Sequence, residues 1–91
     1  MIACARHILV KTKDDAEKIK ILLSKGKDFA SLAKKYLTCS SAKKGGNLGE
    51  FQRGKMVKVF DNIVFKKTIL NVHGPIKTKF GFHLIETIYR N

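Results

Sequence analysis

Residues 2–10 read Ile-Ala-Cys-Ala-Arg-His-Ile-Leu-Val. Their side chains alternate between two faces, as in a strand, where successive residues point to opposite sides of a sheet. His7 and Leu9 fall on one face, while Arg6, Ile8 and Val10 fall on the other. The stretch therefore predicts the first strand of the fold.

Two helices are predicted directly after this strand. Thr12 stands three residues before Asp15 in a capping-box pattern, and apolar residues then recur at helical spacing until Gly26. Asp28 is the expected cap of the second helix. The predicted buried stripe of that helix consists of Phe29, Leu32, Ala33 and Tyr36.

The middle of the chain predicts a loop, a short strand and a third helix. Residues 38–48 are rich in Ser, Lys and Gly, and the pair Gly45-Gly46 permits positive φ angles. A short edge strand is expected over residues 48–51. After Gly54 the apolar positions again follow a helical stripe, made of Met56, Val59, Phe60, Ile63 and Val64.

The end of the chain predicts a hairpin, with strands over residues 76–78 and 82–89 and a turn between them. The complete order of elements indicates an α+β fold, in which helices surround a small, mostly antiparallel sheet of about four strands. No repeat or linker divides the 91 residues, so residues 1–91 are expected to form one domain.

Charge and cysteine content limit the class of protein. Nineteen Lys and Arg against seven Asp and Glu give a formal charge of +12, which attracts acidic partners. The scatter of the lysines favours solvated helix faces over a dedicated groove. Neither a membrane helix nor a secretory signal is recognisable, and the two cysteines form no C-x-x-C pair, so we expect reduced thiols and a cytoplasmic location.

Two histidines are candidates for chemistry. His7 lies in the first predicted strand and His83 in the last. If these strands are neighbours, the two imidazoles meet across the sheet and fix each other's tautomers through a hydrogen bond. The alternative, that each is a half-buried structural histidine, stays open at this point.

From Ala5 to Arg90 the sequence resembles the parvulin family of peptidyl-prolyl cis/trans isomerases. Four motifs carry the resemblance in order and spacing. They are His7-Ile8-Leu9-Val10, the segment from Cys39 through Gly45-Gly46-Asn47-Leu48-Gly49 to Phe51, the segment from Gly54 to Phe60, and Thr78-Lys79-Phe80-Gly81-Phe82-His83. A small sheet with surrounding helices, as in the parvulin and FKBP-like architecture, is the fold that the resemblance implies.

The resemblance also implies a site with an apolar and a polar side. Leu48, Met56 and Phe60 are the expected walls of a pocket for the substrate proline ring, and Phe80 is either a further wall or core. Without the resemblance, the i, i+4 spacing of Met56 and Phe60 equally describes core packing. The expected catalytic residues on the polar side are His7, Cys39, Thr78 and His83.

The resulting hypothesis is a cofactor-free isomerase of unphosphorylated Xaa-Pro bonds that assists protein folding as a monomer. Its partners are proline-containing polypeptides. Only three residues separate Val10 from the first helical positions, which leaves no room for the basic loop of phosphate-specific parvulins. Covalent catalysis by Cys39 is not required, because isomerisation breaks no bond. A zinc site of His7, His83, Cys39 and Cys4 lacks local chelating spacing.

Two functions of other classes remain as alternatives. One is a charge-driven module that binds nucleic acid or an anionic membrane surface. It has little support beyond charge, because Phe51, Phe60 and Phe65 fall at core-like positions and form no stacking platform. The other is a chaperone that holds unfolded chains with slight catalysis.

Overall fold

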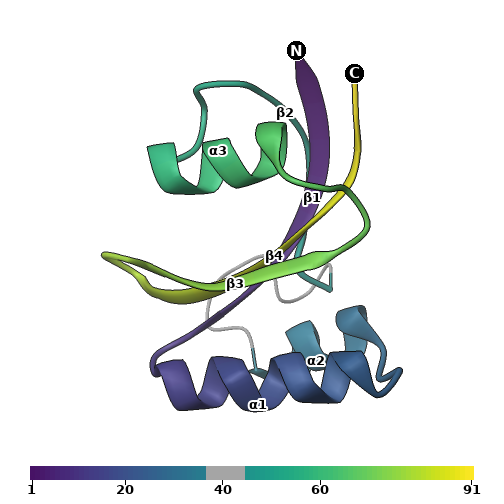
Figure 1. The fold of residues 1–91 in the computed structure, drawn as a ribbon, viewed down its shortest axis with the longest axis vertical. Coiled ribbons are helices and arrows are strands. Elements are labelled where there is room, and N and C mark those ends of the chain that lie inside the picture. Colours follow the sequence, from purple (N-terminus) through teal and green to yellow (C-terminus); the bar gives the residue numbers. More distant parts are fainter. Residues whose placement is uncertain (37–44) are drawn as a thin grey trace.

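The computed structural model describes residues 1–36 and 45–91. Helices and strands follow one another in the order expected from the sequence (Figure 1). Within the described residues, no helix is long and apolar enough to cross a membrane. The elements are β1 (Ile2–Val10), α1 (Lys13–Ser24), α2 (Phe29–Tyr36), β2 (Asn47–Gln52), α3 (Lys58–Lys66), β3 (Val72–Thr78) and β4 (Gly81–Arg90).

The four strands form one antiparallel sheet in the order β2-β1-β4-β3. The first and last strands of the chain are therefore central neighbours, and β2 and β3 are the edges. The two ends of the chain lie side by side (Figure 1). The Asn91 amide donates to the Ile2 carbonyl over 3.0 Å. This arrangement confirms the predicted α+β fold.

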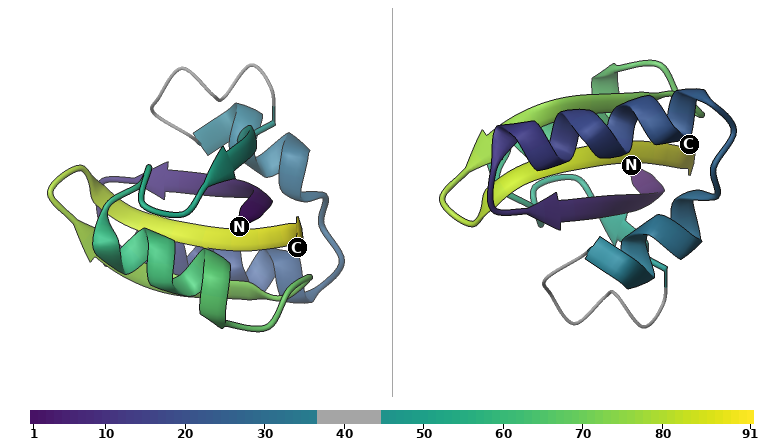
Figure 2. Two further views of the ribbon diagram at one scale, coloured as in Figure 1. Left: turned by 90° about the horizontal axis from the view of Figure 1, so that it is seen from above. Right: turned by 90° about the horizontal axis from the view of Figure 1, so that it is seen from below.

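Helices cover both faces of the sheet, with α1 and α2 on one side and α3 on the other (Figures 1 and 2). Each side has its own apolar cluster. The buried members of the first cluster are Ile8, Leu9, Val10, Ala16, Ile19, Phe29, Leu32, Ala33 and Leu84. The buried members of the second cluster are Ala3, Ala5, Phe60, Val64, Phe65 and Ile85.

The predicted helix caps are present. The Thr12 hydroxyl accepts from the Asp15 amide over 3.1 Å, and the Asp28 carboxylate accepts from the Ser31 amide over 3.0 Å. The prediction that Tyr36 is buried was wrong, because its side chain is 38% exposed. Tyr36 is the last residue of α2, and the Lys35 ammonium lies 5.3 Å from the centre of its ring.

The prediction for the third helix needs two corrections. The helix begins at Lys58, so Met56 precedes it and does not share a helical face with Phe60. Val59 is 46% exposed, although it was expected on the buried stripe. The buried face instead includes Asp61, whose carboxylate accepts from the Gly54 amide over 2.9 Å. That hydrogen bond ties Gly54, in the turn after β2, to the first turn of the helix.

The terminal hairpin is also present, but its first strand starts earlier than predicted. β3 includes Gly74 and Pro75, and the pairing with β4 is irregular between His73 and Ile76. Proline is tolerated because β3 is an edge strand, where a missing amide hydrogen breaks no interior pairing.

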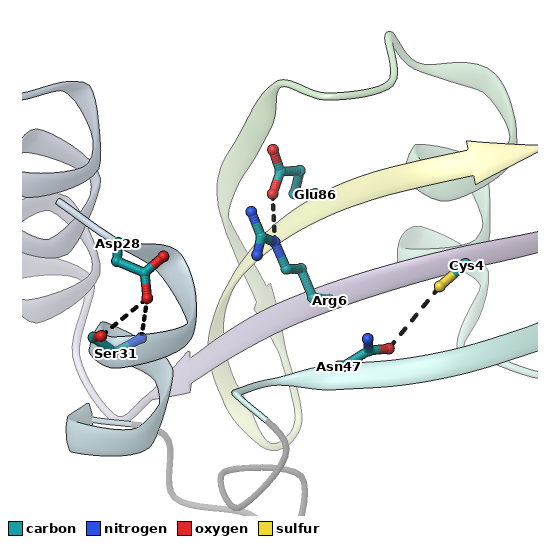
Figure 3. Close-up of polar contacts among 6 residues, drawn as sticks. All are labelled: Cys4, Arg6, Asp28, Ser31, Asn47 and Glu86. Atoms are coloured by element: carbon teal, nitrogen blue, oxygen red, sulfur yellow. Dashed lines mark hydrogen bonds and ion pairs between the residues drawn. The ribbon is translucent and has the colours of Figure 1, made fainter. Parts of the chain in front are cut away.

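An ion pair links the two central strands on the side of α1 and α2. Figure 3 shows Arg6 of β1 and Glu86 of β4 reaching toward each other, with 2.5 Å between Nε and Oε1. The guanidinium also lies 4.4 Å from the centre of the Phe29 ring, so it joins the sheet to α2. The side chain of Glu86 is only 12% exposed, which limits screening by solvent.

We expect Glu86→Gln to lower the free energy of unfolding by about 1 kcal/mol, because the Arg6 guanidinium loses a partly buried carboxylate partner. Urea denaturation at pH 7 measures the effect. Glu17→Gln is the matched control, since Glu17 is exposed on α1 and forms no ion pair among the described residues. Equal stability of the two variants would contradict the assignment.

Candidate functional site

The strand register brings His7 and His83 together on the side of the sheet covered by α3. His7 pairs with Ile85, and Leu9 pairs with His83, so the histidines are diagonal neighbours across β1 and β4. Their Nδ1 atoms are 3.3 Å apart, and the rings are stacked with an angle of 19° between their planes. The contact that the sequence predicted for neighbouring strands is present.

Thr78 extends this contact into a chain of hydrogen bonds. Its hydroxyl oxygen lies 2.7 Å from Nε2 of His83 and also accepts from the Phe80 amide over 3.2 Å. Thr78 is the last residue of β3 and pairs with Gly81, the first residue of β4. A side chain at Gly81 would place its Cβ 2.5 Å from the Val10 carbonyl oxygen, so this tight turn against β1 requires glycine.

The hydrogen-bond chain allows two arrangements of its protons. If His83 carries its proton on Nδ1, it donates to His7, and its Nε2 accepts from the Thr78 hydroxyl. If the proton is on Nε2, His83 donates to Thr78 and accepts from Nδ1–H of His7. In both arrangements each imidazole is neutral, and the tautomer of one determines that of the other.

Burial keeps both imidazoles neutral. Burial, together with a smaller electrostatic effect of the neighbouring His83, lowers the pKa of His7 to about 4. Burial also lowers the pKa of His83 from its usual value. The direction follows from the cost of placing a charge away from water. At pH 7 the pair consists of two uncharged hydrogen-bonding groups.

Phe60 forms the apolar side of the histidine pair. Its ring makes T-shaped contacts with both imidazoles, with ring centres 5.9 Å from His7 and 5.8 Å from His83. Leu48 of β2 and Met56 before α3 are partly buried and pack against the same apolar cluster as Phe60. The three expected pocket walls therefore gather on one side of the sheet, beside the histidines.

Phe80 lies at the exposed turn between β3 and β4. Its side chain is 62% exposed, which excludes the core role that the sequence left open. Its backbone amide donates to the Thr78 hydroxyl, so Phe80 lies next to the hydrogen-bond chain of Thr78, His83 and His7.

Gly46 holds the backbone of His7 in place. The His7 amide donates to the Gly46 carbonyl over 3.0 Å, and a Cβ at Gly46 would lie 2.2 Å from the His7 carbonyl oxygen. Gly45 and Gly46 both have positive φ, as expected for the pair. Besides allowing the positive φ angles of this turn, the glycine pair lets the start of β2 approach β1 beside His7.

Asp61 is a supporting residue that the sequence reasoning missed. Besides the bond from Gly54, its carboxylate lies 3.7 Å from Nε of Arg53. These contacts position the turn that carries Met56. The sequence held one signal for this role, because Asp61 follows Phe60 within an apolar helical stripe. An Asp side chain is rarely buried unless it has a partner.

Cys39 and most of the predicted loop over residues 38–48 lie outside the described residues. The other cysteine, Cys4, lies with its sulfur 3.9 Å from Oδ1 of Asn47 in β2 (Figure 3). In the described part of the chain, no three His, Cys, Asp or Glu side chains are close enough to hold a metal ion.

Comparison with known proteins identifies the family to which the chain belongs. The family model of the rotamases, the PPIC-type PPIase domain, matches residues 7–88. The foldase protein PrsA of Geobacillus sp. (strain WCH70) is 49% identical over 83 residues, which are 90% of this chain and 30% of that protein. The chain thus spans less than a third of the length of this curated relative.

Solved structures share the fold over nearly the whole chain. The crystal structure of PrsA from Bacillus subtilis matches with a TM-score of 0.92 and 42% identity, over 98% of this chain and 35% of that one. The solution structure of NmPin, the parvulin of Nitrosopumilus maritimus, matches with a TM-score of 0.87 and 42% identity, over 97% of this chain and 96% of that one. The chain belongs to the parvulin family of PPIC-type peptidyl-prolyl isomerase domains.

Proposed function

We propose that this chain is a peptidyl-prolyl cis/trans isomerase that acts on unphosphorylated Xaa-Pro bonds and assists protein folding. The observation that carries the proposal is the pair of neutral histidines, bonded to Thr78 on one side and packed against Phe60 on the other. Membership of the parvulin family and the foldase names of its relatives support it.

The reaction requires the loss of amide resonance. Rotation about a peptide bond has a barrier of roughly 18–20 kcal/mol, because the C–N bond has partial double-bond character. At mid-rotation the carbonyl oxygen carries less negative charge, and the proline nitrogen becomes a better hydrogen-bond acceptor. A site that binds this twisted state more tightly than the planar states lowers the barrier, with a tenfold gain in rate for each ~1.4 kcal/mol.

In the proposed mechanism the apolar residues Leu48, Met56 and Phe60 hold the proline ring. Removing the amide from water favours the twisted state, whose charge separation is smaller. His7, His83 and Thr78 form the polar side, and their mutual hydrogen bonds orient these groups before the substrate arrives. Because no covalent bond is broken, the mechanism needs neither a nucleophile nor a cofactor, and Cys39 is proposed to line the polar side.

Preference for unphosphorylated substrates follows from the connection between β1 and α1. β1 ends at Val10 and α1 begins at Lys13, so this connection is too short to form a basic phosphate-binding loop. We propose that the residue before proline is selected loosely and needs no phosphate.

The test is NMR exchange spectroscopy on peptides with one unphosphorylated Xaa-Pro bond. We expect this chain at a few per cent of the peptide concentration to accelerate exchange far beyond the uncatalysed time of roughly tens to hundreds of seconds. His83→Leu, which removes the imidazole from the network, is expected to reduce the acceleration. No acceleration of any peptide, with binding of proline-free unfolded chains instead, would support the chaperone alternative and overturn the isomerase.

A further inference from the structure

Exposed lysines lie in both of the segments that bring apolar side chains to the site. One segment leads from the turn before α3 to Phe60, and the other leads from the end of β3 to Phe80. The first segment contributes Lys55 and Lys58, and the second contributes Lys79, all with exposed side chains. We call these three residues the rim lysines. Lys77 does not belong to them, because it pairs with Phe82, whose side chain packs on the face of the sheet covered by α1 and α2.

The charge of the rim lysines is not balanced by nearby acidic residues. Asp61 is the only acidic residue between Phe51 and Ile85 in the sequence. Its carboxylate is already engaged by the Gly54 amide and lies 3.7 Å from Arg53. On the opposite side of the sheet, by contrast, α1 mixes its lysines with Asp14, Asp15 and Glu17.

Lys79 connects this charge to the hydrogen-bond chain of the site. Its ammonium lies 5.2 Å from the centre of the Phe80 ring, a cation–π geometry that holds the charge over an exposed aromatic surface. The Phe80 amide in turn binds the Thr78 hydroxyl, which contacts His83. A positive charge therefore lies beside the polar side of the site, on a turn whose backbone is fixed.

We infer that the site selects proline-containing segments with acidic residues next to the proline. The inference rests on the proposed isomerase and names its substrate class. An acidic flank gains attraction to the rim lysines when the proline enters the apolar side, and the positive field raises the rate of encounter. A lysine flank is repelled by the same charges.

An acidic polypeptide fits the surface better than a nucleic acid does. Single-stranded nucleic acids are bound by exposed aromatic rings that stack on successive bases. Phe51 packs against Phe60 and Phe65 in the second cluster, with 6.4 Å and 6.0 Å between ring centres. Phe80 is exposed, but one ring offers no row for successive bases. Lys79 lies over the exposed Phe80 ring, and Lys55 is the sequence neighbour of Met56, so positive charges adjoin apolar side chains of the site. This arrangement suits a peptide with an apolar proline between charged neighbours.

The test compares three peptides that differ only in the residues flanking the proline, which are glutamate, glutamine or lysine on both sides. We expect kcat/KM for the glutamate peptide to exceed that for the glutamine peptide about fivefold at low salt, and to approach it at high salt. The double variant Lys58→Gln, Lys79→Gln should bring this ratio close to one. The charge-reversed pair Lys58→Glu, Lys79→Glu should make the lysine peptide the better substrate.

The matched control combines Lys18→Gln on α1 with Lys25→Gln at the C-cap of α1, and it removes the same number of charges from the total of +12 on the other side of the sheet. It should keep the preference for the glutamate peptide. Equal acceleration of all three peptides, or equal loss in both double variants, would overturn the inference while the isomerase stands. No acceleration of any peptide would overturn the isomerase itself. Tight binding of an oligonucleotide that depends on Lys58 and Lys79, without a peptide preference, would assign the lysines to nucleic acid.

Discussion

Phe60→Ala is expected to destabilise this domain by about 3–5 kcal/mol, because it empties the centre of the second apolar cluster. Phe60 is 4% exposed and packs with Val64, Phe65 and Ile85 as well as with the two histidines. A folded chain of 91 residues has a total stability of roughly 5–14 kcal/mol. Thermal and urea unfolding should therefore show a much less stable, and at 37 °C partly unfolded, protein.

A smaller change at the same position separates stability from function. Phe60→Leu keeps most of the volume, and we expect it to lower kcat/KM about tenfold, because the aromatic contacts with His7 and His83 and with the substrate proline are lost. Phe65→Leu is the matched control. Phe65 is also 4% exposed in the same cluster, but its ring contact is with Phe51. Equal losses of kcat/KM in the two variants would assign Phe60 to the core alone.

The second large effect is a loss of stability in mild acid. The pKa of His7 is about 4 in the folded protein and 6.5 in the unfolded chain. The unfolded state therefore binds more protons between these values, so stability falls as the pH decreases from 6.5 to 4. The full difference corresponds to about 3 kcal/mol. His83, whose pKa is also lowered, contributes in the same direction.

Unfolding by urea at pH 7.0 and pH 4.5 measures this effect. Carboxylates begin to titrate at the lower pH, so the comparison is made with variants that share them. His7→Asn should show a clearly smaller loss between the two pH values, whatever its stability at pH 7. His73→Asn should keep the loss of the parent protein, because the His73 ring lies against the Thr68 carbonyl, outside the histidine pair. A His7 titration midpoint near 6.5 by NMR would contradict the prediction.

Much of the fold was predictable because its signals are local. The alternation of residues 2–10, the caps at Thr12 and Asp28 and the turn before Phe82 each depend on neighbouring residues. One error occurred where the local turn before a helix was not visible in the periodic pattern. Met56 matched a helical stripe, but the Gly54–Asp61 hydrogen bond delays the start of α3 to Lys58.

The candidate site was predictable as a set of residues but not as a geometry. Parvulin motifs identified His7, Thr78 and His83 as one group, although they lie far apart in the sequence. Their roles in catalysis stay predictions, as do the cytoplasmic location and the monomeric state. The role of Cys39 likewise stays a prediction.

By itself, the sequence determined the order of helices and strands, the α+β class and the membership in the parvulin family, because these depend on local periodicity and on motif spacing. Only the tertiary structure decided that His7 and His83 are diagonal neighbours with lowered pKa values, that Phe80 is exposed and that Gly46 supports His7. These properties arise from strand register and burial, which depend on contacts between residues that are distant in the chain.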